Sequence, residues 1–287
     1  MSEDQVKAAA DPPPEKPGRT TKALVLAAGR RGSEDSVAQL QNKTHKCLVE
    51  IDGRVMLERV VESLLESGRI DCVLVSIERE DLLGATPKLG AWLDSGRMRF
   101  TPSRETLADS VFEAVRAETD PYPMVITTGD NVLHTPEFLR EFTDRALASR
   151  SDLLVAFTER RSVHAAYPHV ELNWHRLKDG DFSSCNVYGL TSERGMSAVD
   201  VFRGGGQFGK RHWRILKAFG LMPFLLYKTH SVTAETIVQR IAKNLSVRAD
   251  LVILDYPFGP IDVDNPRFYR IAEDILKQRR TPSRSRR

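Results

Sequence analysis

The sequence alternates between short apolar runs and longer segments in which apolar residues recur every three or four positions. The short runs predict strands, and the helical spacing predicts helices. Predicted strands are Ala23–Leu26, Cys47–Ile51, Asp71–Ile77, Met98–Thr101, Met124–Thr128, Leu153–Phe157, 170–174, 185–190 and 251–254. Predicted helices are Val55–Ser67, Thr106–Glu118, Thr135–Ser149, Gly195–Arg203, Arg214–Phe219, Thr233–Asn244 and Pro266–Gln278. This alternation predicts an α/β fold with a mostly parallel sheet and crossover helices.

The same pattern predicts one large domain between two tails. Residues 1–21 are rich in proline and residues 279–287 are mainly basic, so both stretches are expected to be disordered. The domain is expected to span residues 22–278. Between 160 and 190 the apolar period shifts toward two, which marks a different portion of the same domain.

The first predicted strand leads into a small basic loop. The strand has no polar residue between Ala23 and Ala28, as expected for a parallel strand covered on both faces. At its carboxyl end the side chains become small, at Ala27, Ala28 and Gly29, and Arg30 and Arg31 follow. Open α/β sheets bind nucleotides where a strand ends in such a glycine loop, and the arginines suit a phosphate chain. A buried strand that ends in a plain turn also fits these residues.

Two further segments place carboxylates beside predicted elements. Asp130 follows the apolar strand 124–128, which brings it to the same sheet edge as Gly29. Asp262 and Asp264 precede a helix that Pro266 opens, and strand alternation points both side chains to one side. A turn at Asp130 and a helix cap at residues 264–265 are the structural alternatives.

Together with Lys46, these segments resemble the MobA-like NTP transferases, which are nucleotidyltransferases of the glycosyltransferase-A-like fold. The matching segments are Leu26–Gly29 and Lys46–Gly53, which precede an apolar helix. The resemblance implies a three-layer αβα architecture with a mostly parallel mixed sheet, a variant of the Rossmann fold like that of nucleotide-diphospho-sugar transferases. The chain departs from the family at His45, where proline is usual. The loop glycine also comes one position late, so either Arg30 or Arg31 can take the loop-arginine role.

The resemblance also implies an activity and its site residues. The chain is expected to transfer a nucleoside monophosphate from an NTP to a phosphorylated small-molecule acceptor, such as a sugar, polyol or alcohol phosphate, with release of pyrophosphate. Lys46 with Arg31 or Arg30 is the expected catalytic set, and Mg²⁺ is expected on Asp130 and Asp264, with Asp262 as the alternate. The expected nucleotide contacts are Leu26, Ala27, Ala28, Gly29, Gly32, Ser103, Thr106, Ser110 and Gly129. Thr106 also fits a plain helix cap.

The resemblance places the acceptor-binding portion at about 160–230, with Asn186 and Tyr188 near the acceptor. Lys210 and Arg211 follow a glycine-rich run and can bind an acceptor phosphate, although a solvated loop has the same composition. Residues 210–228 are both basic and apolar. They fit a peripheral membrane contact or a buried helix pair broken at Pro223.

Composition narrows the partners and the compartment. The formal net charge of +3 is mild, and no nucleic-acid partner is expected. The three cysteines lack metal-ligand spacing and suggest a reducing compartment, and no signal peptide or bilayer-length apolar run is present, so a cytoplasmic location is expected. A glycosyltransferase that uses an NDP-sugar and a non-catalytic nucleotide-binding protein are the alternative functions. The sequence does not identify the base, the acceptor or the oligomeric state.

Overall fold

The computed structural model describes residues 20–29, 32–200 and 221–280. Its strands are β1 (Thr21–Leu26), β2 (Glu50–Ile51), β3 (Arg54–Val55), β4 (Ile70–Ile77), β5 (Met98–Pro102), β6 (Met124–Thr128), β7 (Leu153–Glu159), β8 (His175–Leu177), β9 (Gly180–Leu190) and β10 (Ala249–Ile253). Its helices are α1 (Met56–Glu66), α2 (Pro87–Asp94), α3 (Leu107–Arg116), α4 (Pro136–Ala148), α5 (Arg160–Ala166), α6 (Met196–Asp200), α8 (Leu221–Lys228), α9 (Ala234–Asn244) and α10 (Pro266–Arg280).

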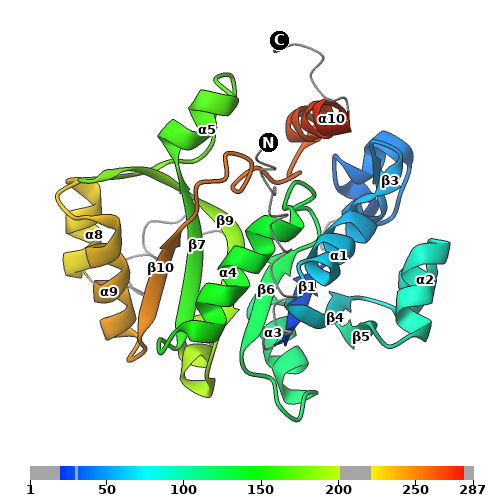
Figure 1. The fold of residues 1–287 in the computed structure, drawn as a ribbon, viewed down its shortest axis with the longest axis horizontal. Helices are drawn as coiled ribbons and strands as arrows, with labels where there is room; N and C mark the ends of the chain where they lie inside the picture. Colours follow the sequence, from blue (N-terminus) through cyan, green and yellow to red (C-terminus); the bar gives the residue numbers. More distant parts are fainter. Residues whose placement is uncertain (1–19, 30–31, 201–220, 281–287) are drawn as a thin grey trace, which may run out of the picture.

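Eight of these strands form one mixed sheet at the centre of the molecule (Figure 1). The strand order is β10-β7-β9-β6-β1-β4-β5, and β8 pairs with β9 beside this path. Strand β9 runs antiparallel to β6, β7 and β8, whereas the remaining pairs are parallel. The predicted mostly parallel α/β sheet is therefore confirmed.

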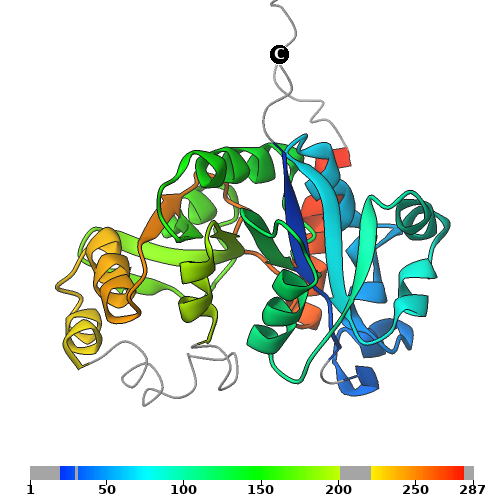
Figure 2. The ribbon, with the colours of Figure 1, turned by 90° about the horizontal axis from the view of Figure 1, so that it is seen from below.

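Helices cover both faces of the central strands and make three layers (Figure 2). On one face, Val25 of β1 belongs to a buried cluster with Leu57 of α1 and Phe138 of α4. On the other face, Leu24 packs in a cluster with Val111 of α3 and Met196 of α6. Alternate residues of β1 are thus buried on opposite sides, which explains why the strand is apolar from Ala23 to Leu26.

Strand β7 is covered differently from β1. Its residues alternate between buried and half-buried along the whole strand, so one face packs into the core and the other remains partly open. Leu154 and Ala156 lie on the covered face and are 1% and 0% exposed. The period of two in this half of the chain therefore reflects a sheet that is only partly covered.

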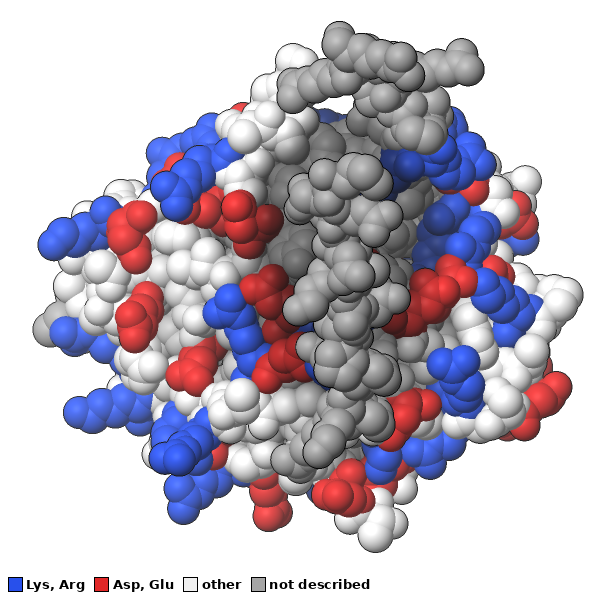
Figure 3. Space-filling view, in the orientation of Figure 1, with Lys and Arg blue, Asp and Glu red and all other residues white. Residues whose placement is uncertain are grey.

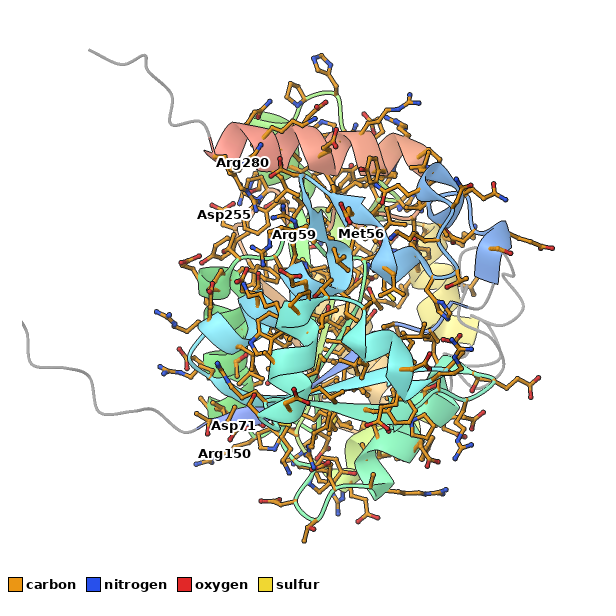
Figure 4. The ribbon with its side chains drawn as sticks, turned by 90° about the vertical axis from the view of Figure 1, so that its right-hand side faces the viewer. Met56, Arg59, Asp71, Arg150, Asp255 and Arg280 are labelled. Carbon is orange, nitrogen blue, oxygen red and sulfur yellow. The ribbon has the colours of Figure 1, made fainter. Side chains whose placement is uncertain are left out.

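A second apolar cluster fixes the C-terminal helix beside the carboxyl ends of the strands. Ala272 and Ile275 of α10 pack with Ile51 of β2 and with Val132, which follows β6. Strands β2 and β3 form a hairpin whose turn residues Asp52 and Gly53 both have positive φ, 49° and 75°. Two arginines hold this turn: Arg280 contacts the Asp52 carboxylate at 2.7 Å and Arg59 contacts it at 3.4 Å. Figure 4 labels both arginines, Arg280 at the end of α10 and Arg59 on α1.

Several predicted elements need correction. The strand predicted at 170–174 is wrong, because Val170 turns into the α10 cluster and pairing with β9 begins only at His175. The strand predicted at 47–51 is mostly a 3₁₀ turn, Lys46–Leu48, followed by the short β2. Helices α2 and α5 were not predicted.

The ends of the predicted helices also differ. Helix α10 continues two residues past Gln278, because Arg279 donates to the Leu133 carbonyl at 2.9 Å and Arg280 binds the hairpin turn. Helix α8 includes Pro223 in its first turn, where a missing N–H is tolerated. The helix predicted at 214–219 and the tails 1–19 and 281–287 lie outside the described residues. Among the described helices, none is long and apolar enough to cross a bilayer.

Candidate nucleotide and metal site

Lys46 lies between two carboxylates that are distant in the sequence. Its Nζ donates to Asp130 Oδ2 at 2.5 Å and to Asp264 Oδ1 at 3.2 Å. The three residues come from the 3₁₀ turn after the glycine loop, from the end of β6, and from the segment before α10. The structure therefore brings together the amine and the two carboxylates that the sequence analysis had selected from separate regions.

The backbone around Asp130 is tied to β1. The N–H of Gly129 donates to the Leu26 carbonyl at 3.0 Å, which carries the β1–β6 pairing past the end of β6. The Thr128 hydroxyl donates to Asp130 Oδ1, so this carboxylate is held on one oxygen by Thr128 and on the other by Lys46. Asp130 is 8% exposed and thus has a fixed orientation inside the site.

The loop after Asp130 is joined to the segment before α10. His134 is buried, and its Nε2 donates to the Gly259 carbonyl at 2.9 Å. Burial lowers the pKa of His134 to about 4, although this hydrogen bond opposes the shift, so the ring is neutral at physiological pH. The N–H of Val263 donates to the Asp130 carbonyl at 3.2 Å, which makes a second link between the two segments.

Buried and exposed residues alternate along 261–264, and this alternation sets the direction of the Asp262 and Asp264 side chains. Ile261 and Val263 are fully buried in the α10 cluster, whereas Asp262 is half-buried and the Asp264 side chain is 64% exposed. Both carboxyl groups thus project away from the apolar cluster. The helix cap is supplied by Asn265, whose Oδ1 accepts from the N–H groups of residues 267 and 268 at 3.0 and 3.2 Å. Asp264 is therefore not needed as the cap.

Asp130, Asp262 and Asp264 form a compact acidic group. Each offers a carboxylate oxygen within 4.8 Å of the other two. Lys46 supplies one positive charge against these three groups. Burial by itself would lower the pKa of Lys46, but Asp130 and Asp264 raise it above its ordinary value, so the amine stays charged. Mg²⁺ prefers one or two carboxylates together with phosphate oxygens and water, and this donor set fits it.

Asn186 is the partner of Asp262. It lies where the β7–β9 register shifts, with φ of 54°, and its Nδ2 donates to Asp262 Oδ2 at 2.8 Å. Burial raises the pKa of Asp262 to about 8, with Asp130 and Asp264 adding to the shift. The bulge thus aims Asn186 at the acidic group, which accords with the frequent position of bulges beside sites. Tyr188 lies two residues further along β9, and burial raises the pKa of its hydroxyl. Acceptor binding by either residue stays a prediction.

The Thr106 and Ser110 hydroxyls, predicted near the nucleotide, already have partners within the protein. Thr106 caps α3 by accepting the Asp109 N–H at 3.0 Å. The Ser110 hydroxyl accepts the Arg104 N–H at 2.9 Å and donates to the Thr106 carbonyl at 3.1 Å. Ser103 continues the β4 pairing through its N–H. The structural alternative considered for Thr106 is thus observed, and nucleotide contacts by these residues stay a prediction.

Of the remaining predicted residues, Gly32 is described by the structure and four basic residues are not. Gly32 follows the glycine loop and donates to the Gly29 carbonyl at 2.7 Å. Arg30, Arg31, Lys210 and Arg211 lie outside the described residues.

Sequence reasoning missed Thr128 and Glu78. Glu78 is the first residue after β4, and its carboxylate contacts both Gly29 and His45. Both residues stand at the carboxyl ends of central strands, the same signal that selected Gly29 and Asp130.

Charge on the molecular surface is mixed. On the face in Figure 3, basic and acidic side chains alternate over the described residues. This distribution agrees with the mild formal net charge of +3. The concentration of charge at the candidate site is therefore a local feature, made by the acidic group and Lys46.

Comparisons with known proteins agree with this geometry. The MobA-like NTP transferase domain profile matches residues 23–181, more than half of the chain. No curated protein sequence matches the chain.

Solved structures with a similar fold were also found. A hypothetical transferase from Thermus thermophilus has a TM-score of 0.68 at 22% identity, with 87% of this chain and 99% of that chain covered. The 4-diphosphocytidyl-2C-methyl-D-erythritol synthase from Anaerococcus prevotii has a TM-score of 0.54 at 14% identity, with 90% and 99% covered. A CMP:2-keto-3-deoxy-manno-octonic acid synthetase complexed with CTP has a TM-score of 0.52 at 14% identity, with 91% and 100% covered. At these identities the structures establish the fold.

Proposed function

Because the chain belongs to the MobA-like NTP transferase family, we propose that it is a Mg²⁺-dependent nucleotidyltransferase. It transfers a nucleoside monophosphate from an NTP to a phosphorylated small-molecule acceptor and releases pyrophosphate. The observation that carries this proposal is the Lys46 ammonium bonded to Asp130 and Asp264, at the sheet edge where the glycine loop begins.

The reaction joins two anions. A phosphate oxygen of the acceptor attacks the α-phosphorus of the NTP, and a new P–O bond forms. The bond from the α-phosphorus to the bridging oxygen breaks, and its electron pair leaves with pyrophosphate. Because the acceptor oxygen is already anionic, the step needs no strong general base. The obstacle is electrostatic repulsion, which fixed positive charge reduces.

The residues of this chain supply that charge and orient the reactants. Lys46 faces the α-phosphate or the acceptor phosphate, and its raised pKa keeps it cationic throughout the reaction. Arg30 and Arg31 are assigned to the β- and γ-phosphates. Asp130 and Asp264, with Asp262 as the alternate, would hold Mg²⁺, which when bound contributes positive charge at the α-phosphate.

The acceptor is assigned to the β7–β9 side of the site, within the portion at about 160–230. Asn186 lies beside the acidic group and Tyr188 lies on the same strand. Lys210 and Arg211 are assigned to the acceptor phosphate. A sugar, polyol or alcohol phosphate supplies the anionic nucleophile that this chemistry requires.

A two-step assay with the full chain tests the proposal. ATP, CTP, GTP and UTP are first screened with Mg²⁺ for thermal stabilisation, because a ligand that binds the folded state raises the melting temperature. The stabilising nucleotide is then combined with sugar, polyol and alcohol phosphates, and pyrophosphate release is measured against samples without acceptor.

Acceptor-dependent pyrophosphate release would support nucleotidyl transfer. In parallel samples that contain an NDP-sugar in place of the NTP, sugar transfer without pyrophosphate release would support the glycosyltransferase alternative. NTP binding without turnover across the acceptor panel would support a non-catalytic nucleotide-binding protein.

A further inference from the structure

Glu78 continues the pairing between β1 and β4 beyond the end of the strands. The last backbone bond of this ladder runs from the Ala27 N–H to the Ser76 carbonyl at 2.9 Å. Two residues later, the Gly29 N–H points to the same side, where the Glu78 carboxylate accepts it at 2.9 Å. The side chain of Glu78, directly after β4, thus accepts the hydrogen bond where the backbone ladder ends, and it holds Gly29 at the start of the glycine loop.

The second oxygen of Glu78 holds the segment that carries Lys46. It lies 3.1 Å from Nε2 of His45, the residue directly before Lys46. His45 Nδ1 lies 2.9 Å from the Thr44 hydroxyl. When Nε2 bears the proton, it donates to Glu78, and the Thr44 hydroxyl donates to Nδ1. Glu78 therefore connects two loops that are 33 and 49 positions away from it in the sequence.

Steric contact adds to these hydrogen bonds. The His45 ring packs directly over Gly29, and a Cβ at Gly29 would stand 2.9 Å from His45 Cδ2. A side chain at residue 29 would therefore require the His45 ring to shift away from Gly29. Since the Gly29 N–H is bonded to Glu78, this glycine contributes mainly by leaving room for His45.

We propose that Glu78 is a positioning residue for the nucleotide, which acts by holding the glycine loop against the segment that ends at Lys46. The inference rests on the proposed function, because it assigns the NTP phosphates to these two loops. The Lys46 amine has its own contacts to Asp130 and Asp264. Loss of the Glu78 contacts therefore weakens NTP binding more than it slows the chemical step.

Two substitutions separate geometry from charge. Glu78→Gln can keep both contacts: its Oε1 accepts the Gly29 N–H, and its amide donates to His45 Nε2 once the His45 proton moves to Nδ1. Glu78→Ala removes both contacts. Glu80→Ala is the matched control, since it deletes an exposed carboxylate two residues further along the chain.

The experiment uses the full chain with ATP, CTP, GTP and UTP, each with Mg²⁺. Calorimetric titration without acceptor gives Kd, and pyrophosphate release gives KM and kcat. Glu78→Ala is expected to raise Kd and KM about tenfold or more, the equivalent of one charge-assisted hydrogen bond. Glu78→Gln and Glu80→Ala are expected to stay within about threefold of wild type, with kcat changed less than KM throughout.

The outcomes distinguish this proposal from the proposed function. Active wild type with an unchanged Kd and KM in Glu78→Ala would overturn the positioning role alone. A Glu78→Gln variant as defective as Glu78→Ala would overturn the positioning role, because it would show that the charge of Glu78 and not its hydrogen-bond geometry affects NTP binding. Wild-type protein that binds NTP without turnover would refute the transfer reaction, while the Kd values still decide the role of Glu78. Wild type that binds no NTP would overturn both.

Discussion

Replacing Lys46 with methionine tests how the acidic group and its ammonium act together. Methionine keeps most of the length of the side chain and removes its charge. In the structure this ammonium contacts Asp130 and Asp264, and Asp262 completes a group with oxygens within 4.8 Å of one another. The variant therefore leaves the acidic group without this cation, and we expect opposite effects on catalysis and on metal binding.

The size of each effect follows from the charge that is lost. One preorganised electrostatic contact to a transition state is worth about 10²–10³ in kcat, so turnover should fall by that factor. Two unit charges about 4 Å apart interact by about 4 kcal/mol at an effective dielectric constant of about 20, and the repulsion between an ammonium and a divalent ion is about twice as large. Water around the exposed Asp264 reduces this value. We therefore expect nucleotide-free protein to bind Mn²⁺ about tenfold tighter or more, which needs only about 1.4 kcal/mol.

Electron paramagnetic resonance of free Mn²⁺ measures the affinity, and coupled detection of pyrophosphate measures turnover. Lys43→Met, three residues earlier, is the matched control and should change neither quantity. Turnover at the wild-type rate in Lys46→Met would refute the catalytic assignment. Weaker Mn²⁺ binding in this variant would refute the view that the ammonium and a divalent cation compete for the same carboxylates.

Three other outcomes are expected. Asp130→Asn should weaken Mn²⁺ binding about tenfold or more, because the variant removes the most buried carboxylate of the group; unchanged binding in the same titration would contradict the assigned ligand set. Asn186→Gly should be about 1 kcal/mol more stable toward urea than Asn186→Ala, because alanine is strained at the left-handed backbone of this position; equal stabilities would contradict the φ of 54°. Burial lowers the pKa of His134 from 6.5 to about 4, so between these pH values the unfolded chain binds a proton that the folded chain does not. The free energy of unfolding should therefore fall by about 3 kcal/mol as the pH drops from 6.5 to 4, and it should fall less in His134→Gln.

The central strands could be predicted because their local pattern and their tertiary environment agree. The runs Ala23–Leu26 of β1 and Met124–Ile126 of β6 are apolar on both faces, and helices cover both faces. The segment at 170–174 has an equally suggestive pattern, yet Val170 is buried against α10, which is almost a hundred residues away in the sequence. Helices α2 and α5 have only eight and seven residues, too few for a clear helical period. The strand that was predicted wrongly is explained by a contact distant in the sequence, and the two helices that were not predicted are explained by their short length.

The candidate site shows the same division. The convergence of Lys46, Asp130 and Asp264 follows from the rule that parallel strands end at one edge, together with the family resemblance. The sequence pattern could not decide whether Asp262 or Asp264 is the better candidate metal ligand, because both lie on one side of an extended segment. The structure separates their partners: Lys46 contacts Asp264, and Asn186 contacts Asp262. No local pattern could show this, since each contact spans many residues.

Because α10 packs beside the site, the acidic group is completed late during synthesis of the chain. A ribosome delivers the glycine loop first and Asp264 more than two hundred codons later, and the helix that anchors this carboxylate follows it. A nascent chain can therefore build most of the central sheet while its acidic group is still incomplete. The complete acidic group can therefore form only after α10, which anchors Asp264, has left the ribosome.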